Sequence, residues 1–300
     1  MSTKLKQYNY LNTFNLALAV FIIIWGAWVR LSGSGAGCGD HWPLCNGEVI
    51  PMAPSLKTLT EYVHRLTSGI FGITIFASMV LSRRLFGPGE LARKFAFASL
   101  FFTITEALIG AVLVKKGLVV DNSSALRAWV IGFHLVNTFI LLAALVGQLI
   151  VTGPVSKFQL STKEKTLWAV GFLIFLLVGA TGAISALGNT LFPETSLVAG
   201  VLKDFDANSH FLIRLRIFHP VLAISLFGII QYLAYPLKTK LAKSLSHLSW
   251  VAVFFGAINW MLLAPKWGAL THLFIADALW CLFVATFIQC YYNFSSFKNA

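Results

Sequence analysis

Four histidines lie inside long apolar stretches of this chain, where an ionisable side chain is costly and is by default a functional candidate. From each histidine to the inner end of its own stretch is about 18 to 19 residues, or roughly 28 Å along a helix. The imidazoles are therefore expected at one common depth, near the outer edge of the hydrocarbon layer. The four residues are His64, His134, His219 and His272.

Matched depth favours a shared role for these histidines. A lone histidine in a membrane helix is often only hydrogen-bonded to a neighbouring helix, and that reading stays open for each of them. Paired histidines on facing helices of a four-helix bundle are typical of bis-histidine haem ligation. We predict two haem sites, one at His64 and His134 and one at His219 and His272. Zinc or copper is less favoured, because three or four ligands would have to converge on one point.

Arginines stand at the outer ends of the same stretches, where the anionic propionates of a haem would need partners. Pairing with propionates and snorkelling to the membrane interface explain them equally well. The candidates are Arg30, Arg65, Arg214 and Arg216.

One carboxylate distinguishes the two predicted sites. Glu61 stands three residues before His64, on the same helical face and one turn further out. The corresponding position before His219 is Arg216. If chemistry happens at only one site, Glu61 marks it, and the second site suits a permanent redox cofactor. The alternative is an ion pair of Glu61 with Arg65, worth only tenths of a kcal/mol at an exposed position.

Two further acids lie within apolar stretches, where they are costly without partners. They are Glu106 and Asp277. Either could relay protons or join two helices by a hydrogen bond, and the second role is slightly favoured.

The apolar stretches themselves define the fold class. The chain has 300 residues, of which 57% are apolar and 11% charged, against about 25% charged in soluble proteins. Because a bilayer-spanning helix needs roughly 20 apolar residues, we predict an all-α polytopic membrane protein with eight spans. They lie near residues 13–31, 62–82, 96–114, 128–151, 166–187, 211–235, 249–265 and 270–292.

The net charge of +12 comes from loops between spans and does not indicate nucleic-acid binding. Most of the basic residues fall on one side of the predicted topology, which the positive-inside rule makes cytoplasmic together with both termini. Lys115, Lys116 and Arg127 are a mild exception. The residues on the basic side are Lys4, Lys6, Arg83, Arg84, Arg93, Lys94, Lys157, Lys163, Lys165, Lys238, Lys240, Lys243 and Lys298.

The chain divides into two related halves, predicted as pseudo-symmetric four-helix bundles over residues 1–154 and 155–300. A linker from Thr152 to Lys165 separates them. Since each half has an even number of spans, the halves share one orientation, related by an axis along the membrane normal. The matching pairs are Gly26-Ala27 with Gly179-Ala180, Gly110-Ala111 with Gly256-Ala257, and His134-Leu135 with His272-Leu273.

Two cysteines lie in the glycine-rich outer loop after the first span. Cys38 and Cys45 are in an oxidising location, where a disulfide is expected. A metal site that also uses Asp40 and His41 is less favoured, because all its ligands would come from one tight loop. Thiol–disulfide exchange is a second possible role for the pair.

Several motifs together resemble the haem A synthases, over essentially the whole chain. The most specific is GAWVRLSGSGAGCGDHWPLCNG, at the end of the first span, and EYVHRLTSG in the second span is nearly as specific. The others are HLVN, RIFHP and LLAPKWGALTHL.

The resemblance implies an eight-span enzyme of the bacterial inner membrane that oxidises the C8 methyl group of haem O to a formyl group by successive hydroxylations. It implies a haem b cofactor on His219 and His272, substrate haem near His64 and His134, and a catalytic role for Glu61. The implied partners are the haem O synthase (a farnesyltransferase), cytochrome oxidase assembly factors and the lipid bilayer. Glu106 departs from the family pattern, which commonly has glutamine in this place.

The main alternative is a di-haem b-type cytochrome that carries electrons from quinol. It explains the four histidines and the number of spans equally well. It does not explain Glu61 or the cysteine loop, and it predicts haems near both membrane faces rather than at one depth.

Overall fold

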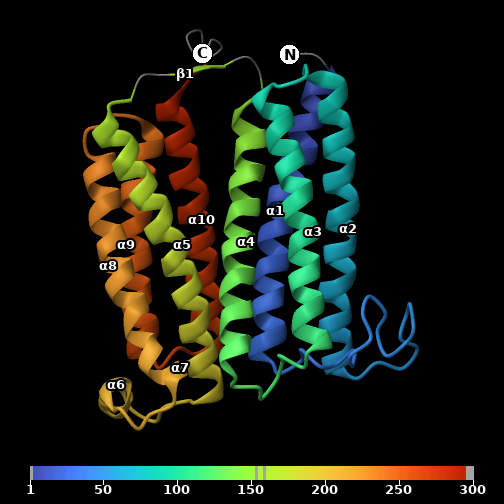
Figure 1. Ribbon diagram of the computed structural model, residues 1–300, viewed down its shortest axis with the longest axis vertical. Coiled ribbons are helices and arrows are strands. Elements are labelled where there is room, and N and C mark those ends of the chain that lie inside the picture. Colours follow the sequence, from blue (N-terminus) through green and yellow to red (C-terminus); the bar gives the residue numbers. More distant parts are fainter. Residues whose placement is uncertain (1–2, 153–154, 158–159, 295–300) are drawn as a thin grey trace.

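The computed structural model describes residues 3–152, 155–157 and 160–294, and it is almost entirely helical (Figure 1). Eight of the described helical segments are long and apolar enough to cross a membrane, which confirms the predicted fold class. They are α1 (Thr3–Leu31), α2 (Leu56–Leu85), α3 (Leu91–Lys115), α4 (Ala125–Ile150), α5 (Thr162–Leu191), the run of α7 (Phe211–Arg214), η1 (Leu215–Ile217) and α8 (Phe218–Ala234), α9 (Lys240–Met261) and α10 (Lys266–Tyr291). The other described elements are helix α6 (Leu197–Phe205) and strands β1 (Val155–Lys157) and β2 (Tyr292–Phe294).

The spans form two rings of four helices that stand side by side (Figure 1). In the first ring, α1 packs on α2, α2 on α3, α3 on α4, and α4 on α1. The second ring repeats this order with α5, α8, α9 and α10. Helices α2 and α4 therefore lie diagonally across the first ring, and α8 and α10 across the second. Each predicted histidine pair comes from such a diagonal pair of helices.

The two rings meet where α4 contacts α5 and α10, and where α1 contacts α10. Aromatic side chains fill this interface. The indole N–H of Trp280 donates a 2.6 Å hydrogen bond to the carbonyl of Phe139, and the two rings stack with centroids 5.2 Å apart. Phe139 also lies against Gly179, where an added Cβ would be only 2.6 Å from the phenyl ring. The core therefore runs through the contact between the halves.

The position of Gly179 changes the predicted register of the internal repeat. Gly26 lies against the imidazole of His64, and in the second half Gly182, not Gly179, lies against His219. The counterpart of Gly26-Ala27 is thus Gly182-Ala183, three residues beyond the predicted pair. The two glycine–alanine pairs of α5 occupy different faces, because Gly179 packs on the other half and Gly182 packs on a histidine within its own ring.

Serine caps fix where several helices begin. Ser55 and Ser124 accept hydrogen bonds from backbone N–H groups three residues later and so start α2 and α4. Ser161 forms a capping box with Glu164 at the start of α5.

The sixth span is interrupted, although the sequence predicts a continuous run over 211–235. A 3₁₀ turn, η1, separates α7 from α8. Pro220 lies in the first turn of α8 and has no N–H to donate to the carbonyl of Arg216, so regular α-helical bonding fails at that point. The break lies directly before His219.

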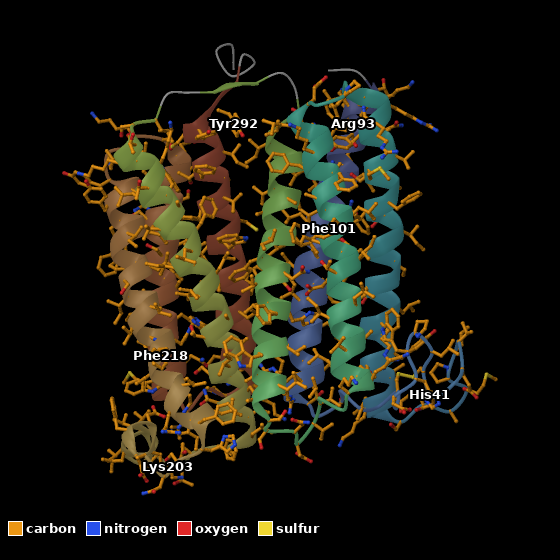
Figure 2. The ribbon with its side chains drawn as sticks, in the orientation of Figure 1. His41, Arg93, Phe101, Lys203, Phe218 and Tyr292 are labelled. Carbon is orange, nitrogen blue, oxygen red and sulfur yellow. A yellow bond between two sulfur atoms is a disulfide. The ribbon has the colours of Figure 1, made fainter. Side chains whose placement is uncertain are left out.

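The described ends of the chain lie at the same end of the molecule (Figure 1). There β1 pairs antiparallel with β2. Figure 2 shows Arg93 and Tyr292 at this end and His41 and Lys203 at the opposite end. Residues 153–154 and 158–159 of the predicted linker, the side chain of Lys157, and Lys298 lie outside the described part, and the division at residue 154 stays a prediction.

Candidate functional site

Three of the four histidines are held in the same way, against a glycine of a neighbouring helix. A Cβ at Gly26 would lie 2.9 Å from Cε1 of His64, and one at Gly182 would lie 3.0 Å from Cε1 of His219. In the same way, a Cβ at Gly256 would lie 2.9 Å from Cε1 of His272. A side chain at any of these glycine positions would have to displace the imidazole from the helix. The structure therefore reserves space for these three rings.

The second pair has the separation that one haem iron requires. The ring centroids of His219 and His272 are 6.2 Å apart. Metal–nitrogen bonds of about 2 Å, plus about 1 Å from each nitrogen to its ring centre, put two imidazoles on one iron roughly 6 Å apart. Nδ1 of His219 lies 3.1 Å from the carbonyl oxygen of Val178, which orients that ring. These residues fit a bis-histidine haem.

The first pair is arranged differently. His64 and His134 lie on the diagonal helices α2 and α4. Nδ1 of His134 lies 3.2 Å from a carboxylate oxygen of Glu106 on α3. The angle at Nδ1 does not meet hydrogen-bond geometry, so the two groups are within ion-pair distance without a hydrogen bond between them. No described atom lies within 4 Å of a Cβ built at Gly110, the position that matches Gly256, so His134 has no such glycine contact.

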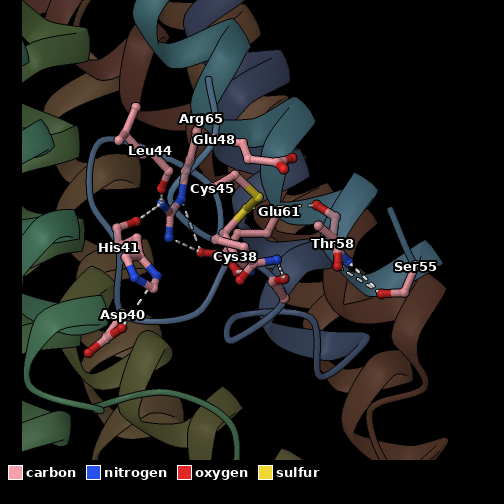
Figure 3. Close-up of a disulfide and its surroundings, with 12 residues drawn as sticks. Cys38, Asp40, His41, Leu44, Cys45, Glu48, Ser55, Thr58, Glu61 and Arg65 are labelled. Atoms are coloured by element: carbon pink, nitrogen blue, oxygen red, sulfur yellow. Dashed lines mark hydrogen bonds and ion pairs between the residues drawn. A yellow bond between two sulfur atoms is a disulfide. The ribbon is translucent and has the colours of Figure 1, made fainter. Parts of the chain in front are cut away.

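Glu61 is buried between α2 and the outer loop, with 4% of its side chain exposed. One carboxylate oxygen accepts a 2.9 Å hydrogen bond from the backbone N–H of Cys38 (Figure 3). The other accepts bonds from Nε and Nη2 of Arg65 at 3.1 and 2.5 Å. The ion pair weighed from the sequence is therefore present, but it is buried rather than exposed to solvent.

The outer loop is closed by the predicted disulfide between Cys38 and Cys45, which is confirmed (Figure 3). Nη1 of Arg65 donates 2.6 Å bonds to the carbonyls of His41 and Leu44 inside the disulfide ring. Gly37 packs so tightly on α2 that a Cβ there would lie 2.5 Å from the carbonyl oxygen of Lys57. The loop and the Glu61 carboxylate thus form one connected unit.

The four candidate arginines occupy different environments. Arg30 donates bonds to the carbonyl of Ala186 and the hydroxyl of Thr190, which links α1 to α5 across the two halves. Arg65 donates its hydrogen bonds to Glu61 and to the loop carbonyls, while Arg214 is exposed. Contacts with propionates stay a prediction for all four.

Arg216 is neutralised by two carboxylates that the sequence analysis did not connect with it. Its guanidinium lies 2.8 Å from Asp204 on α6 and 3.6 Å from Glu194. Burial raises the pKa of the Asp204 carboxyl even though Arg216 lies beside it. Each predicted site therefore has an arginine beside a carboxylate at its outer end. The contrast predicted from the sequence, with a carboxylate at the first site and an unpaired Arg216 at the second, is not present. Helix α6 has a sequence signal, the N-cap Ser196 before an apolar stretch, that could have revealed it.

The two intramembrane acids differ. Glu106 accepts hydrogen bonds from Asn137 and Thr138 on α4, so the predicted helix–helix role is confirmed for it. Asp277 is fully buried, and its carboxylate oxygens have no hydrogen-bond partner in the described part of the chain. The helix–helix bond expected of Asp277 is therefore not formed among those residues.

No group of three or more histidine, cysteine, aspartate or glutamate side chains converges on a metal-sized point within residues 3–152, 155–157 and 160–294. Two opposed histidines are sufficient for a haem, because the porphyrin supplies the remaining ligands of the iron.

Comparison with known proteins gives a family match and partial relatives. The family model of the cytochrome oxidase assembly proteins, COX15-CtaA, matches residues 9–284. A Thermus thermophilus protein named protoheme IX farnesyltransferase is 41% identical over 275 residues, which is 88% of this chain and 45% of that protein. A Bacillus cereus protein named heme A synthase is 40% identical over 98 residues, or 33% of this chain and 32% of that protein. The chain thus spans less than half of the Thermus relative.

Proposed function

The chain belongs to the cytochrome oxidase assembly protein family, and on this premise we propose that it is a haem A synthase. The proposed reaction converts the C8 methyl group of haem O to a formyl group. This is a four-electron oxidation: two successive hydroxylations, which need an oxygen donor and an electron acceptor from outside the chain, give a geminal diol that loses water to form the aldehyde.

The difference between the two histidine pairs carries the proposal. The first pair has carboxylates near it, with Glu106 at 3.2 Å from His134 and Glu61 one turn outward from His64. In the second pair, Nδ1 of His219 meets a backbone carbonyl instead. A carboxylate beside a ligand histidine suits a site where protons leave a substrate, and an uncharged backbone carbonyl in the same place suits a cofactor that only exchanges electrons. This supports chemistry in the first half and a permanent cofactor in the second.

Glu61 is the proposed catalytic residue. Its carboxylate would accept a proton released as the methyl carbon is oxidised, or would stabilise positive charge that develops there. Arg65 and the N–H of Cys38 fix the carboxylate from two sides, so little reorganisation is needed when the substrate changes charge. The disulfide loop would cover this end of the first ring and exclude water.

His219 and His272 would hold haem b, and His64 and His134 would receive the substrate haem. A haem in the second half supplies electron transfer, which side chains alone cannot provide. Gly182 and Gly256 leave the two rings of this half the space they need, and the carbonyl of Val178 orients His219.

The proposed location is the inner membrane of a bacterium, with both termini in the cytoplasm and the disulfide loop outside. Basic residues at the terminal end of the molecule support this orientation. The proposed substrate supplier is a haem O synthase, and the relative named protoheme IX farnesyltransferase supports a link to that enzyme. Cytochrome oxidase assembly factors are the proposed partners downstream.

The deciding experiment supplies the chain with haem O in cells that make no haem A and identifies extracted haems by mass. We expect hydroxylated and formyl haem, which cells without the chain should lack. Two results together would instead support the di-haem cytochrome: only unmodified haem is extracted, and the haems bound to the protein are reduced by quinol.

Loss of the disulfide should lower stability more than it lowers activity. The Cys38→Ser/Cys45→Ser double variant should lose about 2.5 kcal/mol of unfolding free energy, because the reduced loop gains freedom in the unfolded chain. Some haem A formation should persist, since Arg65 still binds the loop carbonyls. Thermal unfolding in detergent and haem extraction measure the two effects.

The free cysteine Cys281 provides the control, because Cys281→Ser changes a thiol without opening a loop. Complete loss of haem A with unchanged stability in the double variant would show that the pair exchanges electrons instead.

A further inference from the structure

His134 departs from the pattern that the other three histidines follow. His64, His219 and His272 each lie against a glycine of a neighbouring helix. The corresponding space at Gly110 holds no described atom within 4 Å, and His134 instead lies 3.2 Å from Glu106. Glu106 and Gly110 are one helical turn apart on α3, so the ring has exchanged a glycine contact for a carboxylate contact.

Glu106 is itself held firmly in place. Its two carboxylate oxygens accept 2.5 Å bonds from the side chains of Asn137 and Thr138. Asn137 in turn donates to the carbonyl of Phe102 and accepts from Thr105, both on α3. These bonds tie α3 to α4 one turn below His134. The carboxylate therefore cannot swing away from the histidine without breaking the network.

We propose that Glu106 is a positioning residue that accepts a hydrogen bond from Nδ1 of His134 and makes this histidine an electron-rich ligand of the substrate haem. This inference rests on the proposed function, because it requires a haem on His134. Nδ1 of His134 is already 3.2 Å from the carboxylate, and a hydrogen bond there would leave Nε2 free to hold the iron. Partners of the second ring nitrogen are known to fix the orientation of a ligand histidine and to raise its basicity.

The two halves then differ in the acceptor that each offers to a ligand histidine. His134 has a carboxylate, whereas His219 has the neutral carbonyl of Val178. The charged acceptor donates more electron density through the ring and favours oxidised iron at the first site. The neutral acceptor leaves the second haem at a higher potential. The first haem is thus expected to have the lower reduction potential of the two.

The test is a redox titration of the full-length protein loaded with haem, with Glu106→Gln as the main variant. Glutamine keeps the shape and can still bond to Asn137 and Thr138, but it carries no charge. We expect the potential of the first haem to rise, its affinity for the protein to fall about 10-fold, and the second haem to keep its potential. The component missing from the His64→Ala variant identifies the first haem.

A second variant should shift the potential of the first haem in the opposite direction. Thr138→Val keeps the size of the side chain but removes a hydroxyl that bonds both Glu106 and the backbone carbonyl of His134. With one partner fewer, the carboxylate becomes a stronger acceptor for the His134 ring, and the first potential should fall. Asp277→Asn is the control, since it replaces a buried acidic side chain on α10 that has no hydrogen-bond partner among the described residues, and it should leave the first potential unchanged.

Unchanged potential in both Glu106→Gln and Thr138→Val, or equal shifts of both haems, would overturn the inference. Its failure is distinguishable from failure of the proposed function, because the potentials are measured whether or not formyl haem is made. A chain that binds no haem in its first half would contradict the proposed function itself.

Discussion

Replacement of Glu61 by glutamine is expected to leave haem bound and to reduce formyl haem formation by about 100-fold or more. The amide has one acceptor oxygen in place of two, so it keeps the bond from either the N–H of Cys38 or the guanidinium of Arg65. Arg65 still donates to the carbonyls of His41 and Leu44, so the outer loop should stay in place. The amide cannot accept a proton or balance positive charge on the methyl carbon. Glu61→Ala should block the product as well, but it removes every acceptor that Cys38 and Arg65 bind at this position, whereas glutamine keeps one.

Extracted haems are separated by chromatography, and the ratio of haem A to haem O is compared with the unmodified protein. Glu48→Gln is the matched control, because Glu48 is an exposed carboxylate that lies just beyond the same disulfide loop. Normal haem A yield from Glu61→Gln, with haem content unchanged, would remove Glu61 from the catalytic role.

Replacement of His219 or His272 by alanine is expected to abolish the low-spin haem b spectrum. The two rings are 6.2 Å apart in the second bundle, and each is held against a glycine, so neither has a substitute nearby. His64→Ala should instead keep that spectrum and lose turnover, because His64 belongs to the first bundle. Absorbance spectra of the reduced purified protein, together with haem extraction, separate the two outcomes.

His247 and His210 offer controls outside the predicted pairs, at the inner end of α9 and in the outer region before α7. Alanine at either position should leave both haem content and spectrum intact. A low-spin spectrum that persists in His219→Ala, or that disappears in His64→Ala alone, would contradict the assignment of the cofactor to the second half.

Sequence alone determined the features that depend on local pattern. Eight apolar runs of bilayer length predict eight spans, because an apolar helix of this length has few other stable environments. The common depth of His64 and His219 stays a prediction from counting along helices, while the Cys38–Cys45 disulfide, expected from two cysteines in one loop, is confirmed. Each of these inferences needs only the rise of a helix or the position of residues close together in the chain.

Tertiary structure decided the features that depend on how helices are rotated about their axes. The contact of His134 with Glu106 joins two helices, and no count along one helix shows which faces meet. Helix α6 brings Asp204 to Arg216, which replaces the predicted cation with a balanced pair. Gly182 and Gly179 read equally well as partners of Gly26, and only packing shows that one faces a histidine and the other faces the second bundle. Side-chain partners across helices are set by the packing of the whole bundle, which local sequence does not encode.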